Sequence, residues 1–395
     1  MIRNHLIVIP FNIPWEWSTD YTNQTAYILS KKNTVICYMW SEALSIKECL
    51  QKGKIPKIIV RHSKNLYLYY PLYFIPFGRF KFVSALNSSL NIFLLKIFIK
   101  YFEISRHLEK KIVWIFYPNL ATIAESLGKD YFTIYDCVDF FAVGTSAERK
   151  WVERHQRRLL AYANLVVANS KVLQKYLKEW RKDVRLVPQG FRFGHFAKYG
   201  KGKQKYKIPK KLANKKPLLG FVGGVNNRLD FELLIKLGKN NPQWNFAVWG
   251  PIQKPFIQKN RFERKLKTLL SLPNVTSGMS KNKREIPAII NGFDIGIIPY
   301  DVTQDFNKFC YPMKLFEYFY LGKPVIATPI EELKRFPKLV RIGNNYHEWE
   351  KIIKEILSKP WPKEYKKLQR KLAEENSWEK KVEKISEILK HKAIV

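Results

Sequence analysis

A helix-forming segment in the last third of the chain carries one cation and one anion among apolar residues. In "CYPMKLFEYFYLGKPVIATP", Pro312 suits the first position of a helix and Gly322 suits its end. The apolar, β-branched run "PVIATP" then predicts a buried parallel strand. Within the predicted helix, Lys314 and Glu317 are three residues apart and therefore share one face.

These two charges match two parts of a nucleotide. The ammonium group of Lys314 can neutralise a diphosphate, and the two oxygens of the Glu317 carboxylate suit two adjacent ribose hydroxyls. Hydrogen bonds to charged groups contribute roughly 1.5–3 kcal/mol, so loss of Glu317 would weaken binding about ten- to a hundredfold. The alternative is a solvated ion pair, which contributes little.

A glycine pair follows an apolar run in "GFVGGVNNRLDF". Gly223 and Gly224 would let the backbone approach a ligand closely. We expect a helix directly after them, whose free N–H groups and dipole favour phosphate. Arg228, near the expected helix start, either assists a diphosphate or lies on a solvated face. The segment is not a Walker loop, because no Gly-Lys-Ser/Thr follows.

Apolar strands alternate with helices in both halves of the chain, which indicates an α/β protein with two parallel, doubly wound sheets. In the first half we expect strands at 5–10, 34–40, 112–118, 131–137, 165–170 and 184–190, and helices at 19–31, 86–108, 147–163 and 170–180. In the second half we expect strands at 217–224, 244–250, 274–278, 294–300, 324–329 and 339–343, and helices at 229–239, 284–292 and 312–321.

A segment rich in Gly, Lys and Pro separates the two halves and predicts a linker. We therefore expect a Rossmann-like domain at 1–195, a linker at 196–216, a second Rossmann-like domain at 217–375 and a last helix within 376–395. A linker between two such domains predicts a cleft.

The candidate ligand site lies beyond the carboxyl ends of the second set of strands, where open parallel sheets bind ligands. Besides the residues named above, this rule places five more around one pocket: Gly250, Gly278, Met279, Tyr300 and Met313.

Composition and charge exclude some classes of protein. The chain is 46% hydrophobic and 15% aromatic, which excludes disorder. Four scattered cysteines without a CxxC pair argue against a zinc site or disulfides and fit a reducing cytoplasm.

The net charge is strongly positive. The chain has 70 Lys and Arg against 33 Asp and Glu, a formal charge of +37, which attracts nucleic acid, anionic lipid or phosphorylated substrates. An A/T-rich genome would give the same excess of basic residues. The alternation of apolar strands and helices argues against a nucleic-acid-binding module.

Two apolar segments are candidates for contact with a membrane surface. The aromatic run at 65–77 is the preferred one, and 90–102 is the other, with a core helix as its alternative. No spanning helix is expected at 82–102, because Asn, Ser and Lys interrupt it. We also expect no signal peptide, since Pro and Trp follow the short first apolar run.

Several segments together resemble a known family over roughly residues 112–390. In the second half they are "GFVGG", "WNFAVWGP", "LPNVTSGMSKNKREIPAIINGFDIGIIPY", "YPMKLFEYFYLGKPVIATP" and "SWEKKVEKISEIL", and in the first half "YDCVDFF", "ANLVVANSKVLQKYL" and "VRLVPQGF". They resemble GT-B glycosyltransferases, in particular glycosyltransferase family 4. "PMKLFEY" is also similar to xanthan-type glucuronosyltransferases.

The resemblance implies a hexosyltransferase with two Rossmann-like domains facing a cleft. Its donor would be a nucleotide-diphosphate sugar, most often a UDP-sugar, held by the second domain. Glu317 would bind ribose, Lys314 the diphosphate, and the backbone around Gly278 and Met279 the base, while the glycine pair would face phosphate. The first domain would bind the acceptor, and the last helix would brace that domain.

The resemblance also bears on cofactors, acceptor and location. The sequence has no DxD motif of the kind that holds a metal with the diphosphate, which favours chemistry without a metal or other cofactor. A lipid-linked or polysaccharide-precursor acceptor is expected, with the enzyme cytoplasmic and peripheral at the inner face of the cell membrane.

One departure from the family leaves the reaction open. Many members have a second glutamate eight residues before the ribose-binding one, and here that position is Phe309, with Asn307 and Lys308 as polar substitutes nearby. A GT-B relative with other nucleotide-sugar chemistry, such as epimerisation, or an inactive subunit is therefore an alternative.

The sequence also leaves open whether the configuration at the anomeric carbon of the transferred sugar is retained or inverted. Inversion needs a general base that deprotonates the acceptor. Asp136 and Asp139 follow the strand at 131–137, and Asp139, further into the loop, is preferred; a helix cap or loop-ordering residue is the alternative. Four histidines are further alternatives: His62, His107, His155 and His195.

Overall fold

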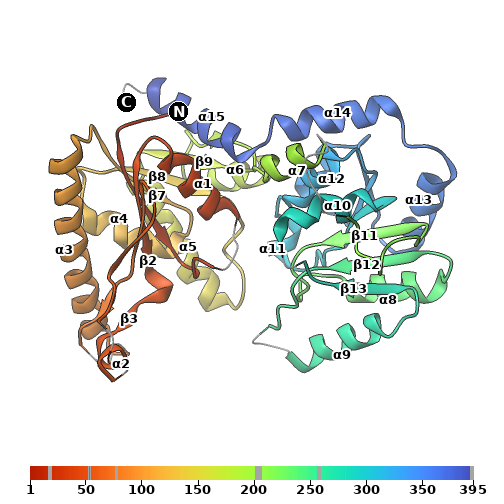
Figure 1. The fold of residues 1–395 in the computed structure, drawn as a ribbon, viewed down its shortest axis with the longest axis horizontal. Helices are drawn as coiled ribbons and strands as arrows, with labels where there is room; N and C mark the ends of the chain where they lie inside the picture. The colour runs from red at the N-terminus through yellow and green to blue at the C-terminus, as the bar shows by residue number, and fades with distance from the viewer. Residues whose placement is uncertain are drawn as a thin grey trace. The chain divides into compact units, whose positions relative to one another are not determined.

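The computed structural model describes residues 1–16, 20–51, 53, 55–75, 79–200, 207–255, 259–280 and 282–391. They form two compact units, each built around its own sheet (Figure 1). The first unit comprises Met1–Pro188 and Trp378–Val395, and the second comprises Gln189–Ser377.

The first unit contains an eight-stranded sheet in the order β10-β9-β8-β7-β1-β2-β5-β4, parallel except for the pair β4–β5. Its strands are β1 Leu6–Phe11, β2 Thr34–Met39, β4 Ile59–Ser63, β5 Leu66–Tyr69, β7 Lys111–Ile115, β8 Phe132–Cys137, β9 Leu165–Ala168 and β10 Arg185–Leu186. A small separate sheet pairs β3 Leu44–Ser45 with β6 Leu72–Tyr73. The helices are α1 Asp20–Ser30, α2 Ile46–Gln51, α3 Lys81–Arg106, α4 Ala121–Leu127, α5 Ser146–Tyr162, α6 Lys171–Leu177 and α15 Trp378–His391.

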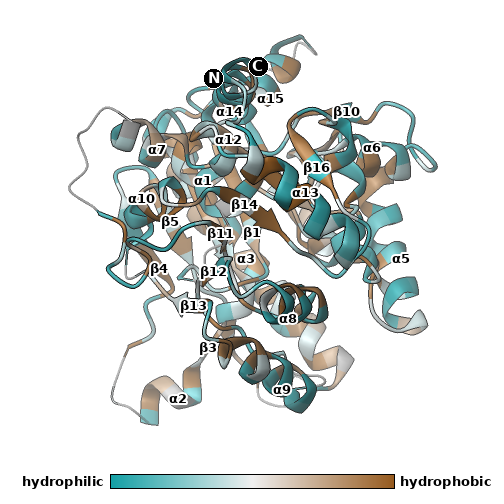
Figure 2. Ribbon diagram, turned by 90° about the vertical axis from the view of Figure 1, so that its right-hand side faces the viewer, coloured by the Kyte–Doolittle hydropathy of each residue, from teal (hydrophilic) through white to brown (hydrophobic). Residues whose placement is uncertain are grey.

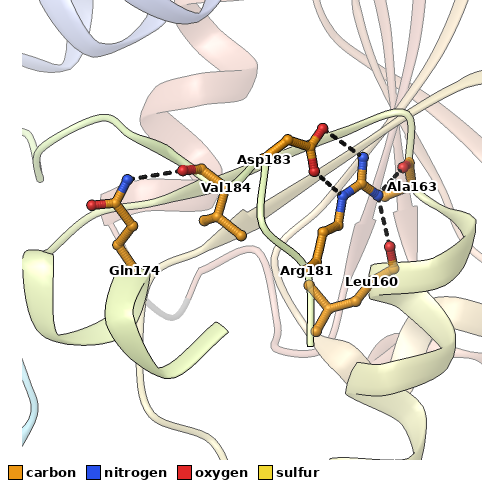
Figure 3. Close-up of polar contacts among 6 residues, drawn as sticks. All are labelled: Leu160, Ala163, Gln174, Arg181, Asp183 and Val184. Atoms are coloured by element: carbon orange, nitrogen blue, oxygen red, sulfur yellow. Dashed lines mark hydrogen bonds and ion pairs between the residues drawn. The ribbon is translucent and has the colours of Figure 1, made fainter. Parts of the chain in front are cut away.

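Polar contacts fix the helix ends of this unit. Thr145 and Glu148 form a capping box at the start of α5. After the end of α5, Arg181 donates to the carbonyls of Leu160 and Ala163 and pairs with Asp183 (Figure 3). Because the last carbonyls of a helix have no partner within it, this arginine satisfies groups that burial would otherwise penalise.

The second unit contains a six-stranded parallel sheet in the order β13-β12-β11-β14-β15-β16. Its strands are β11 Leu218–Val222, β12 Asn245–Trp249, β13 Val275–Gly278, β14 Ile295–Ile298, β15 Val325–Ala327 and β16 Val340–Ile342. Its helices are α7 Phe193–Gly200, α8 Phe231–Asn240, α9 Lys259–Leu270, α10 Ile286–Asn291, α11 Asp305–Lys308, α12 Lys314–Tyr320, α13 Tyr346–Ser358 and α14 Lys363–Glu374. Figure 2 shows hydrophobic strands such as β14, and hydrophilic stretches along α8 and α13.

The α/β class with two parallel sheets is confirmed, but three details differ from the sequence prediction. The predicted linker at 196–216 is wrong at its start, because α7 is helical and Phe196 is buried against Phe191 and Tyr320; residues 201–206 lie outside the described part. The aromatic run at 65–77 is a surface segment only in part, since β5 is buried between β2 and β4 whereas Tyr73 is exposed; residues 76 and 77 lie outside the described part. The β4–β5 hairpin was not predicted.

Candidate functional site

The candidate site lies at the point where the second sheet reverses its strand order. The chain goes from β11 out through β12 to β13 on one side, and from β14 through β15 to β16 on the other. Ligands of open parallel sheets bind at such a switch point, beyond the carboxyl ends of the strands. Gly223 directly follows β11, and Tyr300 lies two residues beyond β14.

Two glycine turns touch each other at this edge. Gly223 and Gly250 have φ of +147° and +156°, and a Cβ built on Gly250 would lie 1.9 Å from the carbonyl oxygen of Gly223. The Gly250 N–H donates to the Gly278 carbonyl at 2.8 Å. A Cβ on Gly278 would lie 2.3 Å from the Trp249 ring. Backbone packing thus requires glycine at position 250, the positive φ favours it at 223, and the Trp249 ring leaves no room for a side chain at 278.

Lys314 places its amino group beside this glycine turn. Its Nζ donates to the Tyr300 hydroxyl and lies 4.9 Å from the centre of the Phe221 ring and 4.7 Å from that of Tyr300. Its Cε lies 3.3 Å from the position of a Cβ on Gly223. The site therefore combines a half-buried cation with a half-buried backbone turn, which suits an anionic ligand.

The buried Tyr318 fixes the helix that carries Lys314 and Glu317. Its hydroxyl lies 3.1 Å from the Gly220 carbonyl, 3.3 Å from the Ile297 carbonyl and 3.3 Å from the Val222 N–H. Burial raises the pKa of this hydroxyl, so it stays protonated and able to donate. Since β11 and β14 are both held, α12 is fixed across the switch point.

Glu317 lies in the first turn of α12 and is half-buried, as is Lys314. The helix begins at Lys314 rather than at the predicted Pro312, with half-buried Met313 as its N-cap. At three-residue spacing the two charged side chains share one helix face, as predicted.

Arg228 is a second cation beside Tyr300. Its guanidinium carbon lies 4.5 Å from the centre of the Tyr300 ring and 4.6 Å from that of Phe306. Its Nε donates to the side-chain oxygen of Asn307 at 2.7 Å, and the Asn307 amide donates to the carbonyls of Arg228 at 3.1 Å and Asp301 at 2.9 Å. Asn307 is fully buried, so it positions Arg228 and is not a free substitute for the missing glutamate.

The helix predicted after the glycine pair begins two residues later than the predicted start at residue 229. The helix, α8, begins only at Phe231, and Asp230 caps it by accepting from the Leu233 N–H at 2.9 Å. A carboxylate therefore occupies the end of the helix that would attract phosphate. Arg228 lies in the preceding loop, on the side of Tyr300.

The remaining candidates of the second unit lie at its strand ends. Met279 follows β13 and is exposed, and next to it Ser280 accepts from Trp249 Nε1 at 3.1 Å. A Cβ on Gly224 would meet the flexible end of Gln253 at 2.4 Å. Phe309 follows α11 and is half-buried.

In the first unit the two candidate bases differ sharply. Asp136 is fully buried in β8, where it accepts from Lys381 Nζ at 2.8 Å and from Trp114 Nε1 at 3.3 Å. Both oxygens are thus occupied in the core, which excludes Asp136 as a base. Asp139 lies in the loop beyond β8 and is half-buried, so it stays the candidate. Cys137 Sγ contacts the Asp139 carbonyl at 3.6 Å.

Two of the alternative histidines have structural contacts. His62 packs against the Trp15 ring, at 5.0 Å between centres, and hydrogen-bonds the Tyr27 hydroxyl at 2.7 Å. His155 Nδ1 hydrogen-bonds the Trp151 carbonyl at 2.8 Å. Across the described residues, no group of three or more His, Cys, Asp or Glu is placed to hold a metal ion.

Comparison with known proteins identifies the class. No family model matches the chain. TuaH of Bacillus subtilis (strain 168), provisionally assigned as a teichuronic acid biosynthesis glycosyltransferase, is 24% identical over 302 residues, 72% of this chain and 73% of that protein. The sucrose-phosphate synthase of Thermosynechococcus elongatus has a TM-score of 0.71 at 14% identity, covering 98% of each chain. HepE of Anabaena, solved with UDP and glucose, has a TM-score of 0.65 at 13% identity, covering 97% of this chain and 99% of its own.

The chain thus has the GT-B fold, and the predicted resemblance to GT-B glycosyltransferases is confirmed. Its relative in Bacillus subtilis supports glycosyltransferase activity as the general class.

Proposed function

We propose that the protein is a hexosyltransferase that moves a sugar from a nucleotide-diphosphate donor, preferably a UDP-sugar, to a hydroxyl of a lipid-linked or polysaccharide-precursor acceptor. One observation carries the donor site: Lys314 and Arg228 both lie over the Tyr300 ring at the switch point, beside the Gly223 turn. The complex of HepE with UDP and glucose supports uracil as the base, and the role assigned to TuaH supports a polysaccharide acceptor.

In the proposed reaction the acceptor oxygen forms a bond to the anomeric carbon of the sugar. The bond from that carbon to the diphosphate breaks, and its electron pair leaves with the diphosphate. Lys314 and Arg228 stabilise this growing negative charge. In enzymes that bind a metal ion at the diphosphate, the metal ion has this role. Glu317 accepts hydrogen bonds from the ribose. We propose Asp139 as the base that takes the acceptor proton if the configuration inverts.

We propose a cytoplasmic location at the inner face of the cell membrane. A formal charge of +37 favours attraction to anionic lipid over free diffusion. A lipid-linked acceptor would be met at that surface.

A second candidate follows from Phe309. An aromatic ring stands where many relatives have a glutamate close to the transferred sugar, and the buried amide of the neighbouring Asn307 is committed to Arg228. Nucleotide-sugar epimerisation, or a subunit that binds donor without turnover, would keep the donor site and dispense with that glutamate.

The test is calorimetric binding of UDP, GDP and ADP to the wild type and to Glu317→Ala. We expect micromolar affinity for one nucleotide and a ten- to hundredfold loss in Glu317→Ala, because the ribose loses a charged acceptor. Glu364→Ala is the matched control, since Glu364 is exposed on α14 of the same unit. Unchanged affinity in Glu317→Ala would remove the ribose assignment.

Turnover then separates the two candidate functions. Release of UDP from a series of UDP-sugars is measured with a lipid-linked acceptor mixture and with EDTA present, because the proposal needs no metal. Transfer in EDTA supports the glycosyltransferase. Tight nucleotide binding with interconversion of the donor sugar, or with no turnover at all, favours the second candidate.

A further inference from the structure

Helix α3 of the first unit presents apolar residues on two opposite faces. Its inward face is buried, with Leu95, Ile99 and Phe102 packed into the unit. A helix with one such face is an ordinary core element. The opposite face is the unusual one, because no described element covers it.

Seven large apolar side chains form a continuous line along the outward face. Each follows the previous one by three or four residues, so they lie on one side of the helix. They are exposed by between 37% and 78%: Phe82, Leu86, Leu90, Phe93, Ile97, Tyr101 and Ile104. We call these seven residues the outer stripe. Figure 1 shows α3 standing along one flank of the first unit.

The helix is long and apolar enough to cross a membrane by its length and composition, but its inner face is fastened to the unit. Asn91 accepts from the Leu72 N–H at 2.7 Å and donates to the Leu72 carbonyl at 2.8 Å. Asn87 makes the equivalent pair of bonds with Ile75, at 3.0 and 2.9 Å. If α3 left the unit, the buried amides of Asn87 and Asn91 would lose these hydrogen bonds. The helix is therefore a fixed part of the surface of the first unit.

The far end of the helix is fastened in the same way. Arg106 donates to the Thr34 hydroxyl at 3.1 Å, the Asn65 side chain at 3.1 Å and the Tyr67 hydroxyl at 2.6 Å. The helix that carries the outer stripe is thus fastened to the unit at Asn87, Asn91 and Arg106, and its backbone is in place before any partner arrives. Binding then costs little conformational entropy.

The charges around the outer stripe select the partner. Lys96 and Lys100 are exposed one helical turn apart, and each directly precedes a stripe residue, so both lie along one edge of the stripe. Arg79 is exposed just before the helix, over the Phe80 ring at 5.1 Å. Within α3 there are four Lys and Arg against one acid, Glu103. An apolar face edged by cations complements an anionic lipid surface.

We propose that the outer stripe of α3 is a membrane-docking surface that lies in the headgroup region of an anionic bilayer, with Lys96 and Lys100 at the lipid phosphates. The stripe belongs to the first unit alone, so the inference holds whether or not the second unit binds a nucleotide. We place the contact at α3 and not at the aromatic run at 65–77, in which β5 is buried.

The experiment is co-sedimentation of the full chain with vesicles of phosphatidylcholine and phosphatidylglycerol in a 7:3 ratio (on the order of physiological anionic content) and of phosphatidylcholine alone. Phe93→Gln/Ile97→Gln should reduce binding at least about tenfold, because two exposed apolar side chains are lost. Lys96→Gln/Lys100→Gln should reduce binding to anionic vesicles about 25-fold, at about fivefold for each basic residue. Ile252→Gln/Leu368→Gln is the control, with two exposed apolar residues of the second unit.

Circular dichroism and thermal unfolding verify that each variant folds, which is expected because all substituted side chains are exposed. Loss in the Phe93/Ile97 variant with retention in the control supports the proposal. Equal vesicle binding by wild type and Phe93/Ile97 variant overturns it, as does a wild type that binds no vesicle. A wild-type dimer that the same variant dissociates, without vesicle binding, would assign the outer stripe to self-association instead.

Discussion

At the scale of single residues, Gly250 decides whether the two turns of the candidate site can meet. Its backbone has φ of +156°, and any Cβ would lie 1.9 Å from the Gly223 carbonyl oxygen, a backbone atom that cannot rotate away. The close approach of these turns shapes the edge where Lys314 presents its amino group. A side chain added at Gly250 would therefore move the backbone of the site as well as alter its surface.

We predict that Gly250→Ala destabilises the fold by at least about 1–3 kcal/mol and weakens nucleotide binding, since one turn must move. Chemical denaturation and calorimetry measure the two effects. Gly128→Ala is the control, because Gly128 also has a positive φ, +104°, but no atom within 4 Å of a Cβ. If the two variants lose equal stability and Gly250→Ala binds nucleotide normally, the contact between the turns has no importance for the site.

The sequence predicted Lys314 and Glu317 as a pair at a helix start, since Pro312, the following apolar run and Gly322 locate that helix. It did not predict how Arg228 is held. Asn307 and Arg228 are 79 residues apart, and their contact depends on how two loops fold over Tyr300. Nothing in the local sequence distinguishes such an asparagine from a solvated one.

At the scale of elements, α15 is fastened to the first sheet by one buried ion pair. Lys381 and Asp136 have side chains 1% and 0% exposed, with 2.8 Å between Nζ and Oδ1. The pair joins residues 245 positions apart, from the last helix to β8. Attraction between buried charges offsets their desolvation only while both are present, so removing one partner leaves an uncompensated charge.

We predict that Lys381→Met lowers the free energy of unfolding by roughly 3–5 kcal/mol. Asp136→Asn/Lys381→Met should recover most of this, because the asparagine still accepts from Trp114 and no charge is left unpaired. Equilibrium denaturation of the single and double variants gives the coupling energy. Lys380→Met is the control, as Lys380 is exposed and pairs at the surface with Glu383. A loss below about 1 kcal/mol in Lys381→Met would mean that the pair does not hold α15.

Strands were predictable where they are continuously apolar, as β1 and β2 are along their whole length. The hairpin of β4 and β5 was missed because β4 is half exposed, with His62 and Arg61 in its sequence, and gives no apolar run. The exposed face of α3 could not be predicted from the sequence either. Apolar residues occur around the whole helix, a pattern that indicates burial on all sides, and only the structure shows that one face stays exposed.

At the scale of the whole molecule, the proposed reaction draws on both units. Asp139 belongs to the first unit, and Lys314, Glu317 and Arg228 belong to the second. In the proposed mechanism, donor binding is then a property of the second unit, whereas proton removal from the acceptor is a property of the first. The two functions should be separable by substitution.

We predict that Asp139→Asn reduces transfer about 10²–10⁴-fold, as expected for loss of a general base, while donor affinity changes less than about twofold. Glu317→Ala should instead lower donor affinity and leave the transfer rate at saturating donor nearly unchanged. The reason is that a lost ribose contact weakens binding more than it slows the chemical step. Asp130→Asn is the control, with an exposed carboxylate in the same unit. Steady-state kinetics at varied donor concentration, beside calorimetry, distinguish the two effects. Wild-type turnover in Asp139→Asn would exclude this carboxylate as the base and favour a retaining reaction, in which the leaving diphosphate itself can accept the proton.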